Sequence, residues 1–228
     1  YPAGDVTAAW ETLTLAASRG RALSVDRMDN EETLGMAFGR LADEFMRVSV
    51  APEVDAYRFS KYASWSGISS PSQAALSTGD AVVAALRVGT SQMDEDQVPE
   101  EDRRLYITPT LLGLVEDLDT TKSREVLARF SKIVRVPQTR FYKGVTLDAG
   151  ATADAGGFTK TPSTGRDLNF MIIHPTAVLQ AVKHDNMKYF SPDVNQTADA
   201  HLMQYRLYHD AFVYENHVDG IYAHVKNS

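Results

Sequence analysis

The sequence contains no cysteine among its 228 residues. This absence excludes disulfide bonds, zinc sites built on thiolates and cysteine nucleophiles, and it is compatible with a reducing cytoplasm. The sequence also lacks any run of about 18 consecutive apolar residues, the length that a membrane-spanning helix requires, and no secretory signal opens the chain. We therefore expect no membrane partner.

Positive charge is in short supply. The chain has 23 Lys and Arg against 30 Asp and Glu, which gives a net charge of −7. A protein that binds nucleic acid tightly must neutralise phosphates with its own surface, so this balance argues against tight nucleic-acid binding, and we expect a genome to be enclosed without sequence-specific contacts. Apolar content is 43% and charged content 23%, both ordinary for a globular protein of one large domain or two smaller ones.

Motifs that carry chemistry are missing as well. There is no HExxH metal motif and no Gly-x-Ser-x-Gly nucleophile elbow, and the glycine-rich stretch around Gly156 and Lys160 does not have phosphate-loop spacing. Histidine followed by aspartate, at His184 and His209, is more typical of an ordinary strand than of a metal site. The sequence predicts no metal, no cofactor and no catalytic residue.

A long amphipathic helix is the clearest feature that is present. Apolar residues recur at alternating intervals of four and three, which keeps them on one helix face; they are Leu34, Phe38, Leu41, Phe45 and Val48. Asp29 with Glu32 three residues later is typical of a helix N-terminus. We therefore expect one continuous helix over Asp29–Val48, with its apolar face buried against a sheet.

Proline and glycine divide the rest of the chain. Pro52 predicts a break at residues 49–51 and a second helix after it, because proline restricts the preceding residue to extended geometry. The stretch SWSGISSPSQ is typical of a connector. Asp80 is expected to cap a helix that runs to about Met93. Its buried side is expected to hold Val82, Leu86, Gly89 and Met93.

Two similar units predict a mixed sheet flanked by helices. Residues 105–117 and 171–185 each contain an apolar run, a Pro-Thr pair and an amphipathic stretch, so each is expected to be a strand that leads into a helix at Pro109 or Pro175. Pro137 interrupts KIVRVPQTRFY, which indicates an edge strand or a bulge. Residues 147–167 have few large apolar side chains and are expected to form a mobile surface loop.

Turn signals complete the pattern at the two ends of the chain. Asp219-Gly220 predicts a tight hairpin between two C-terminal strands beside the long helix, and Arg19-Gly20 predicts a turn in the N-terminal strand segment.

The order of several segments resembles the major capsid proteins of tailed bacteriophages, or of prophages, with the Hong Kong 97-like fold. The resemblance runs through RGRALSVDRMDNEET, AFGRLADEFMR and APEVDAYRFSKYA, and it resumes at RRLYITP, SKIVRVPQTRFY and LYHDAFVYENHVDGIYAH. It implies an α+β fold with a long spine helix in a peripheral domain and a mixed sheet flanked by helices in an axial domain. The expected division is a peripheral domain over 1–65, with the end of an extended loop, an axial domain over 66–199, and C-terminal strands over 200–228 that return to the peripheral domain.

The resemblance implies a structural role: many copies self-assemble into an icosahedral shell that encloses a phage genome. The expected partners are copies of the chain, a scaffolding protein and a portal, and the expected location is the virion capsid, assembled in the cytoplasm of the bacterial host. In this family an N-terminal arm and extended loop precede the spine helix, so we expect further residues before Tyr1. Two alternatives stay open, namely an encapsulin-like shell around cargo protein, and a small α/β enzyme with a site near Thr108 and His174.

Four charged residues surround the expected helix break: Arg47, Glu53, Asp55 and Arg58. One interpretation is a local ion-pair cluster, which contributes roughly 0–1 kcal/mol when it is exposed. The other interpretation, which the family resemblance favours, is an inter-subunit contact that sets the register between neighbours.

Overall fold

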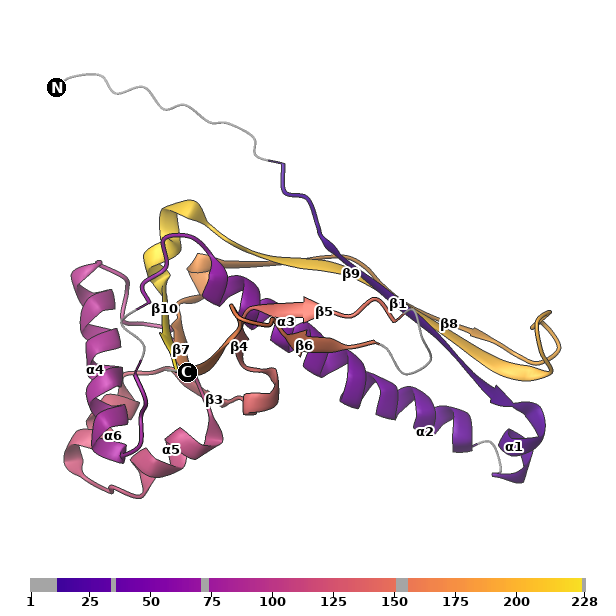
Figure 1. The fold of residues 1–228 in the computed structure, drawn as a ribbon, viewed down its shortest axis with the longest axis horizontal. Coiled ribbons are helices and arrows are strands. Elements are labelled where there is room, and N and C mark those ends of the chain that lie inside the picture. The colour runs from indigo at the N-terminus through magenta and orange to yellow at the C-terminus, as the bar shows by residue number, and fades with distance from the viewer. Residues whose placement is uncertain (1–11, 34–35, 71–73, 151–155, 227–228) are drawn as a thin grey trace.

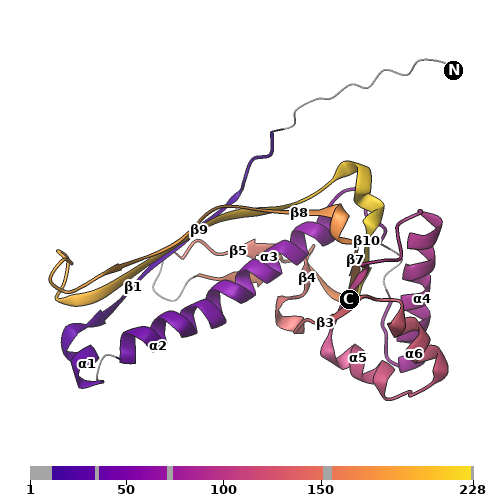
Figure 2. The same ribbon diagram turned by 180° about the vertical axis from the view of Figure 1, so that it is seen from behind.

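The chain forms an elongated α+β structure in which one long helix lies alongside a three-stranded sheet (Figure 1 and Figure 2). The computed structural model describes residues 12–33, 36–70, 74–150 and 156–226. The principal helices are α1 (Arg27–Glu32), α2 (Met36–Phe45), α3 (Ala51–Ser64), α4 (Gly79–Glu95), α5 (Pro109–Glu116) and α6 (Thr121–Ala128).

Two main sheets divide the molecule. The first has the order β1-β9-β8 and consists of β1 (Ala17–Asp26), β9 (Ala200–Val213) and β8 (Val178–Phe190), all antiparallel. The second contains β10 (Ile221–Val225), β7 (Arg166–Ile173), β2 (Arg104–Ile107) and β3 (Lys132–Arg135), with β4 (Tyr142–Lys143) also paired to β7. β3 is an edge strand, as Pro137 indicated.

Local sequence explains how the long helix differs from its prediction. Asp26, not Asp29, caps α1, since its carboxylate accepts from the Met28 amide at 2.8 Å. α1 ends at Glu32 and α2 begins at Met36, so the expected continuous helix from Asp29 is wrong. Leu34 lies outside the described residues.

The expected break before Pro52 is also wrong. Residues Met46–Val50 form a π-helical turn that joins α2 to α3, and the Ala51 amide donates to the Met46 carbonyl. A π turn widens the helix by one residue, which lets the chain pass a proline that has no amide hydrogen to donate. The helix therefore runs without a break from Met36 to Ser64.

The second sheet is covered on both faces. Side chains alternate along its strands, so Leu105, Ile107 and Phe170 pack under α4, α5 and α6, while Met171 and Ile173 pack towards α3. α4 begins after the Thr78 cap rather than at Asp80, and it buries the expected side of Val82, Leu86, Gly89 and Met93.

An arginine is buried where α4 turns into β2. Arg103 is 1% exposed, and its guanidinium donates to the Pro99 carbonyl at 2.9 Å and to Asp94 at 2.7 Å. Burial acts to raise the pKa of Asp94, but hydrogen bonds from Arg129 and Arg103 hold that pKa below its ordinary value. The acidic turn after α4 is thereby fixed from beneath.

Only the first of the two expected strand–proline–helix units is confirmed. β2 leads into α5 at Pro109, whereas β7 leads through the short 3₁₀ turn Pro175–Ala177 into strand β8. β8 pairs with β9 along most of its length, and these ladder bonds override the helical pattern of residues 178–185.

Three turn and loop predictions also fail. Gly20 lies within β1 opposite Arg206, so no turn occurs there. β9 and β10 belong to different sheets and are joined by the 3₁₀ segment Glu215–Gly220, so Asp219-Gly220 is not a hairpin turn. Part of the expected loop 147–167 is ordered, because β5 (Val145–Leu147) pairs with β6 (Phe158–Lys160).

Candidate functional site

The layer formed by the long helix and the β1-β9-β8 sheet is held by aromatic contacts. The Phe38 and Tyr189 rings meet edge to face at 5.0 Å between centroids, and Phe45 meets Tyr205 at 6.1 Å. The apolar face of the helix therefore contacts a sheet, as its spacing predicted. It is not fully buried, however, since no described residue of α2 is buried and Val48 is 53% exposed.

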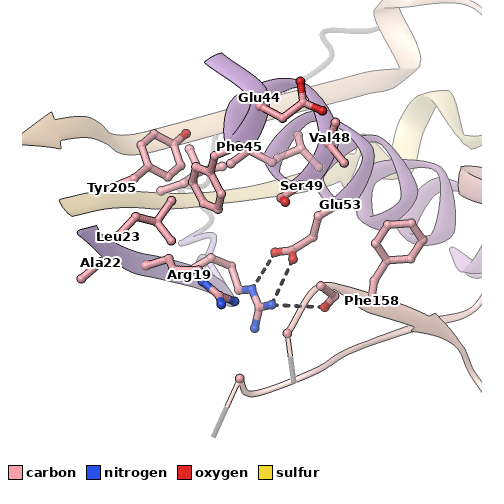
Figure 3. Close-up of a pocket in the computed structure, with 18 of the residues that line it drawn as sticks. Arg19, Ala22, Leu23, Glu44, Phe45, Val48, Ser49, Glu53, Phe158 and Tyr205 are labelled. Atoms are coloured by element: carbon pink, nitrogen blue, oxygen red, sulfur yellow. Dashed lines mark hydrogen bonds and ion pairs between the residues drawn. The ribbon is translucent and has the colours of Figure 1, made fainter. Parts of the chain in front are cut away.

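A cavity of about 1,020 Å³ lies between the helix, β1 and the β5–β6 hairpin. Figure 3 shows Phe45 and Tyr205 on one side of it and Phe158 on the other. Arg19 and Glu53 lie across it, with the Arg19 Nε to Glu53 Oε1 distance at 2.6 Å and a second bond at 3.0 Å.

The same arginine holds the hairpin in place. Arg19 Nη1 donates to the Asp148 carbonyl at 2.6 Å, and Nη2 donates to the Gly157 carbonyl at 3.2 Å. One side chain of β1 thus ties α3 to the segment that the sequence predicted to be a free loop.

The four charged residues expected at the helix break do not form one cluster. Arg47 is exposed and pairs with Glu44 on its own helix at 2.7 Å. Glu53 pairs with Arg19, and Asp55 pairs with Arg140 at 3.0 Å. The interpretation as one local ion-pair cluster is therefore wrong, because none of the four pairs with another within the described part of the chain.

A buried carboxylate that sequence reasoning missed anchors α3 to β9. Asp210 is 1% exposed and accepts from the Tyr57 hydroxyl at 2.9 Å and from the Ala16 amide at 2.8 Å. Burial, together with the hydrogen bond to Asp210, raises the pKa of Tyr57 well above its ordinary value, so this hydroxyl remains a donor. Tyr57 lies five residues after Pro52 in a helix whose buried side faces β9. Its partner is far away in the sequence, so no local pattern indicated the pair.

His209 lies beside this anchor and packs edge to face against the Tyr57 ring at 5.4 Å. It is 2% exposed, and its Nδ1 atom has no hydrogen-bond partner among the described residues. Burial, and then the nearby positive charge of Arg58, lower the pKa of His209. The positive charge of Arg58 thus acts on a buried side chain of its own molecule.

Tyr205 and Asp185 form a second link within the sheet. The Tyr205 hydroxyl donates to Asp185 Oδ1 at 3.0 Å. Burial first, and then this hydrogen bond, raise the pKa of Tyr205 to about 12. The hydroxyl therefore remains a donor at neutral pH and adds a side-chain link between β9 and β8.

The structure does not bring Thr108 and His174 together in one enzyme site. β2 and β7 are antiparallel, with Ile107 opposite Phe170 and Arg104 opposite Ile173, so Thr108 and His174 extend from opposite ends of this strand pair. Within the described ranges no group of three His, Cys, Asp or Glu side chains is placed to hold a metal ion. Nor is any helix in the described part of the chain long and apolar enough to span a membrane.

Comparison with known proteins shows the fold. No family model matches the sequence, and no curated protein matches it. A structure from Mycobacterium phage Che8 aligns with 91% of this chain and 70% of its own, at 12% identity and a TM-score of 0.61. A virus-like particle from Pyrococcus furiosus aligns with 91% of this chain and 76% of its own, at 9% identity and a TM-score of 0.58.

A third structure aligns over the whole length of the chain. It comes from the capsid structure of Cyanophage P-SCSP1u. The match covers 81% of that chain, at 15% identity and a TM-score of 0.56. The chain therefore has the α+β fold of a tailed-phage major capsid protein, as the sequence resemblance implied.

Proposed function

We propose that this chain is the structural subunit of an icosahedral capsid, which self-assembles from many copies and encloses a phage genome. The observation that carries the proposal is the match of more than nine-tenths of the chain to structures from phages and their capsids. Thr108 and His174 do not come together, so they give no support to an enzyme site. The fold, by contrast, is one that matched capsid structures share.

The half-open peripheral layer supports the same proposal. A helix whose apolar face is only half-buried, beside a sheet with exposed Val182, Met187 and Tyr189, is incomplete as a single-chain core. Exposed apolar surface of this kind is typical of contact regions. In a shell, each subunit would cover such surface on its neighbour through repeated heterologous contacts.

The proposal divides the chain into two parts. The division expected from the sequence, with boundaries at 65 and 199, is supported with two changes. The pairing of β8 with β9 supports assigning residues 178–190 to the peripheral part. The pairing of β10 with β7 supports assigning residues 221–225 to the axial part.

The remaining roles belong to the same proposal. A scaffolding protein and a portal would be partners during assembly in the host cytoplasm, and the genome would be enclosed without sequence-specific contacts, consistent with the net charge of −7. Among the four charged residues at the π turn, exposed Arg47 is best placed to meet a neighbouring subunit, while Glu53, Asp55 and Arg58 act within their own chain.

A shell that encloses cargo protein is the second candidate. The comparisons do not favour it, because most of the matched structures come from phages or their capsids and one is a virus-like particle from Pyrococcus furiosus. The contents of the particles separate the two candidates, since nuclease-resistant DNA would indicate a capsid and a protein of fixed stoichiometry would indicate a cargo shell.

Electron microscopy tests the proposal. The complete gene product would be produced in bacteria, alone and together with the products of its neighbouring genes. Closed shells of one uniform size are expected in at least one of the two preparations. A protein that stays dispersed in both, at every concentration tested, would contradict the proposed function.

A further inference from the structure

One face of the β1-β9-β8 sheet has no covering element among the described residues. Along β9, Met203, Tyr205 and Leu207 are buried towards the helix, whereas Gln204 and Arg206 between them are exposed. Because successive side chains in a strand point to opposite faces, Gln204 and Arg206 lie on the face turned away from the helix. We call this the outer sheet face.

The strand register places small residues of β1 and polar or positively charged residues of β8 on the outer sheet face. On β1, Gly20 and Ala22 stand opposite Arg206 and Gln204. On β8, Asn186 and Lys188 stand opposite the same two residues. His184 lies two positions before Asn186, and together these residues line a hollow of about 470 Å³.

The charge of this hollow is one-sided. His184, Lys188 and Arg206 line it with their side chains, and no Asp or Glu of the described residues does. Arg206 makes one long hydrogen bond, to the Ser18 hydroxyl at 3.5 Å. Neither Arg206 nor Lys188 forms an ion pair with another described residue. The small side chains of β1 let a partner approach the backbone closely. The face therefore suits an acidic, protruding segment.

The chain carries such a segment itself, in the turn between α4 and β2. Three acidic side chains are exposed there, namely Glu95, Glu101 and Asp102. None of them forms an ion pair with another described residue. The turn is rigid because buried Arg103 binds the Val98 and Pro99 carbonyls from beneath. A fixed turn loses little conformational entropy on docking.

The two surfaces cannot meet within one molecule. α4 lies at one end of the long axis, while the β1-β9-β8 sheet extends towards the other end (Figure 1). Complementary surfaces at separate places on one chain produce head-to-tail contacts, which continue from copy to copy.

We infer that the outer sheet face of one copy receives the acidic turn, residues 95–102, of a second copy. This inference rests on the proposed function and names one of the contacts that would build the shell. A polyanion such as DNA would compete for the same cations, and its binding is one outcome of the test below.

A charge swap in the complete gene product tests the inference. The sheet variant carries Lys188→Glu and Arg206→Glu, and the turn variant carries Glu95→Lys and Glu101→Lys. All four positions are exposed, so folding is expected to be unaffected, and thermal unfolding checks this. Sedimentation velocity over a concentration series at low ionic strength measures self-association. Each variant should associate at least about tenfold more weakly than the parent, because like charges would then face each other.

Restoration provides the decisive comparison. A chain with all four substitutions should recover association to near the parental level, and an equimolar mixture of the sheet and turn variants should form heterodimers. The matched control is Arg87→Glu with Lys122→Glu, an equal change of charge at exposed positions on α4 and α6, and it should associate as the parent does.

Other outcomes would overturn the inference. Parental association in both swapped variants, or failure of the combined chain to recover, would place the contact elsewhere while leaving the proposed function intact. DNA binding that the sheet variant loses, with association unchanged, would assign the face to a polyanion. A parent that never associates would count against the proposed function as well.

Discussion

The layer around the second sheet, which we propose as the axial part, is packed far more completely than the layer around the first sheet, which we propose as the peripheral part. The axial sheet is covered by α4, α5 and α6 on one face and by the end of α3 on the other, and its central side chains are almost fully buried. The peripheral layer is one helix against one sheet, with half-buried aromatic contacts and the large cavity beside Arg19 and Glu53. The difference indicates that the axial part supplies most of the stability of the single chain, and under the proposed function neighbouring copies would complete the packing of the peripheral part.

Removal of the buried arginine should have the largest effect on stability. Arg103→Ala leaves the Val98 and Pro99 carbonyls without their buried donor, at about 1–3 kcal/mol each, while Asp94 keeps its pair with Arg129, so a loss of about 3–5 kcal/mol in unfolding free energy is expected. Chemical denaturation measures this loss. Arg104→Ala, at the exposed neighbouring position, is the control and should change stability by less than about 0.5 kcal/mol.

A matched pair of leucines compares the two parts directly. Leu86 is 0% exposed in the axial core, and Leu86→Ala should cost about 2–5 kcal/mol. Leu41 is half-buried beside the cavity, and Leu41→Ala should cost less than about 1.5 kcal/mol. Equal losses in denaturation of the dispersed chain would show that the peripheral layer is already a complete core.

These two leucines also show how far the sequence was informative. Helical spacing identified the correct face in both cases, because an amphipathic pattern records which side is apolar. It did not reveal that one face is buried by its own chain and the other only partly, since burial depends on how many layers the fold places around each helix. Phe38, which the spacing places on the buried face, is only half-buried.

Long-range pairing explains the other failures. Residues 178–185 have a helix-like pattern and nevertheless form β8, because β9 supplies a continuous ladder of backbone bonds. Asp210 and His209 have no sequence neighbours that indicate Tyr57 or Arg58 as partners. The π turn before Pro52 was likewise hidden, since proline is ordinarily read as a helix boundary.

The half-buried ion pair should contribute a smaller amount. Glu53→Gln removes the bidentate bond to Arg19 and loosens the hairpin, so a loss of about 1 kcal/mol is expected by thermal unfolding. Arg47→Gln is the control for folding, because its pair with Glu44 is exposed. If Arg47 contacts a neighbour, as proposed, this variant should form fewer shells while unfolding at the parental temperature.

Acid sensitivity should produce the smallest effect near neutral pH. Because the folded chain lowers the pKa of His209, the folded state disfavours its protonation, and the unfolded chain takes up the proton at about pH 6.5. The stability that depends on neutral His209 is therefore complete above that pH and decreases as the pH falls below it. His209→Gln should flatten this decrease in a series of denaturation midpoints. An unchanged slope would show that His209 does not report the α3–β9 packing.

Hydrogen–deuterium exchange in dispersed and assembled protein tests most directly whether neighbours complete the peripheral layer. In the dispersed chain, amides of β2 and α5 should already be strongly protected, while those of α2 and β8 should exchange readily. On assembly, protection of α2 and β8 should rise by at least about tenfold, and that of β2 and α5 should hardly change. Equal protection of both parts in the dispersed chain, with no gain on assembly, would contradict the account.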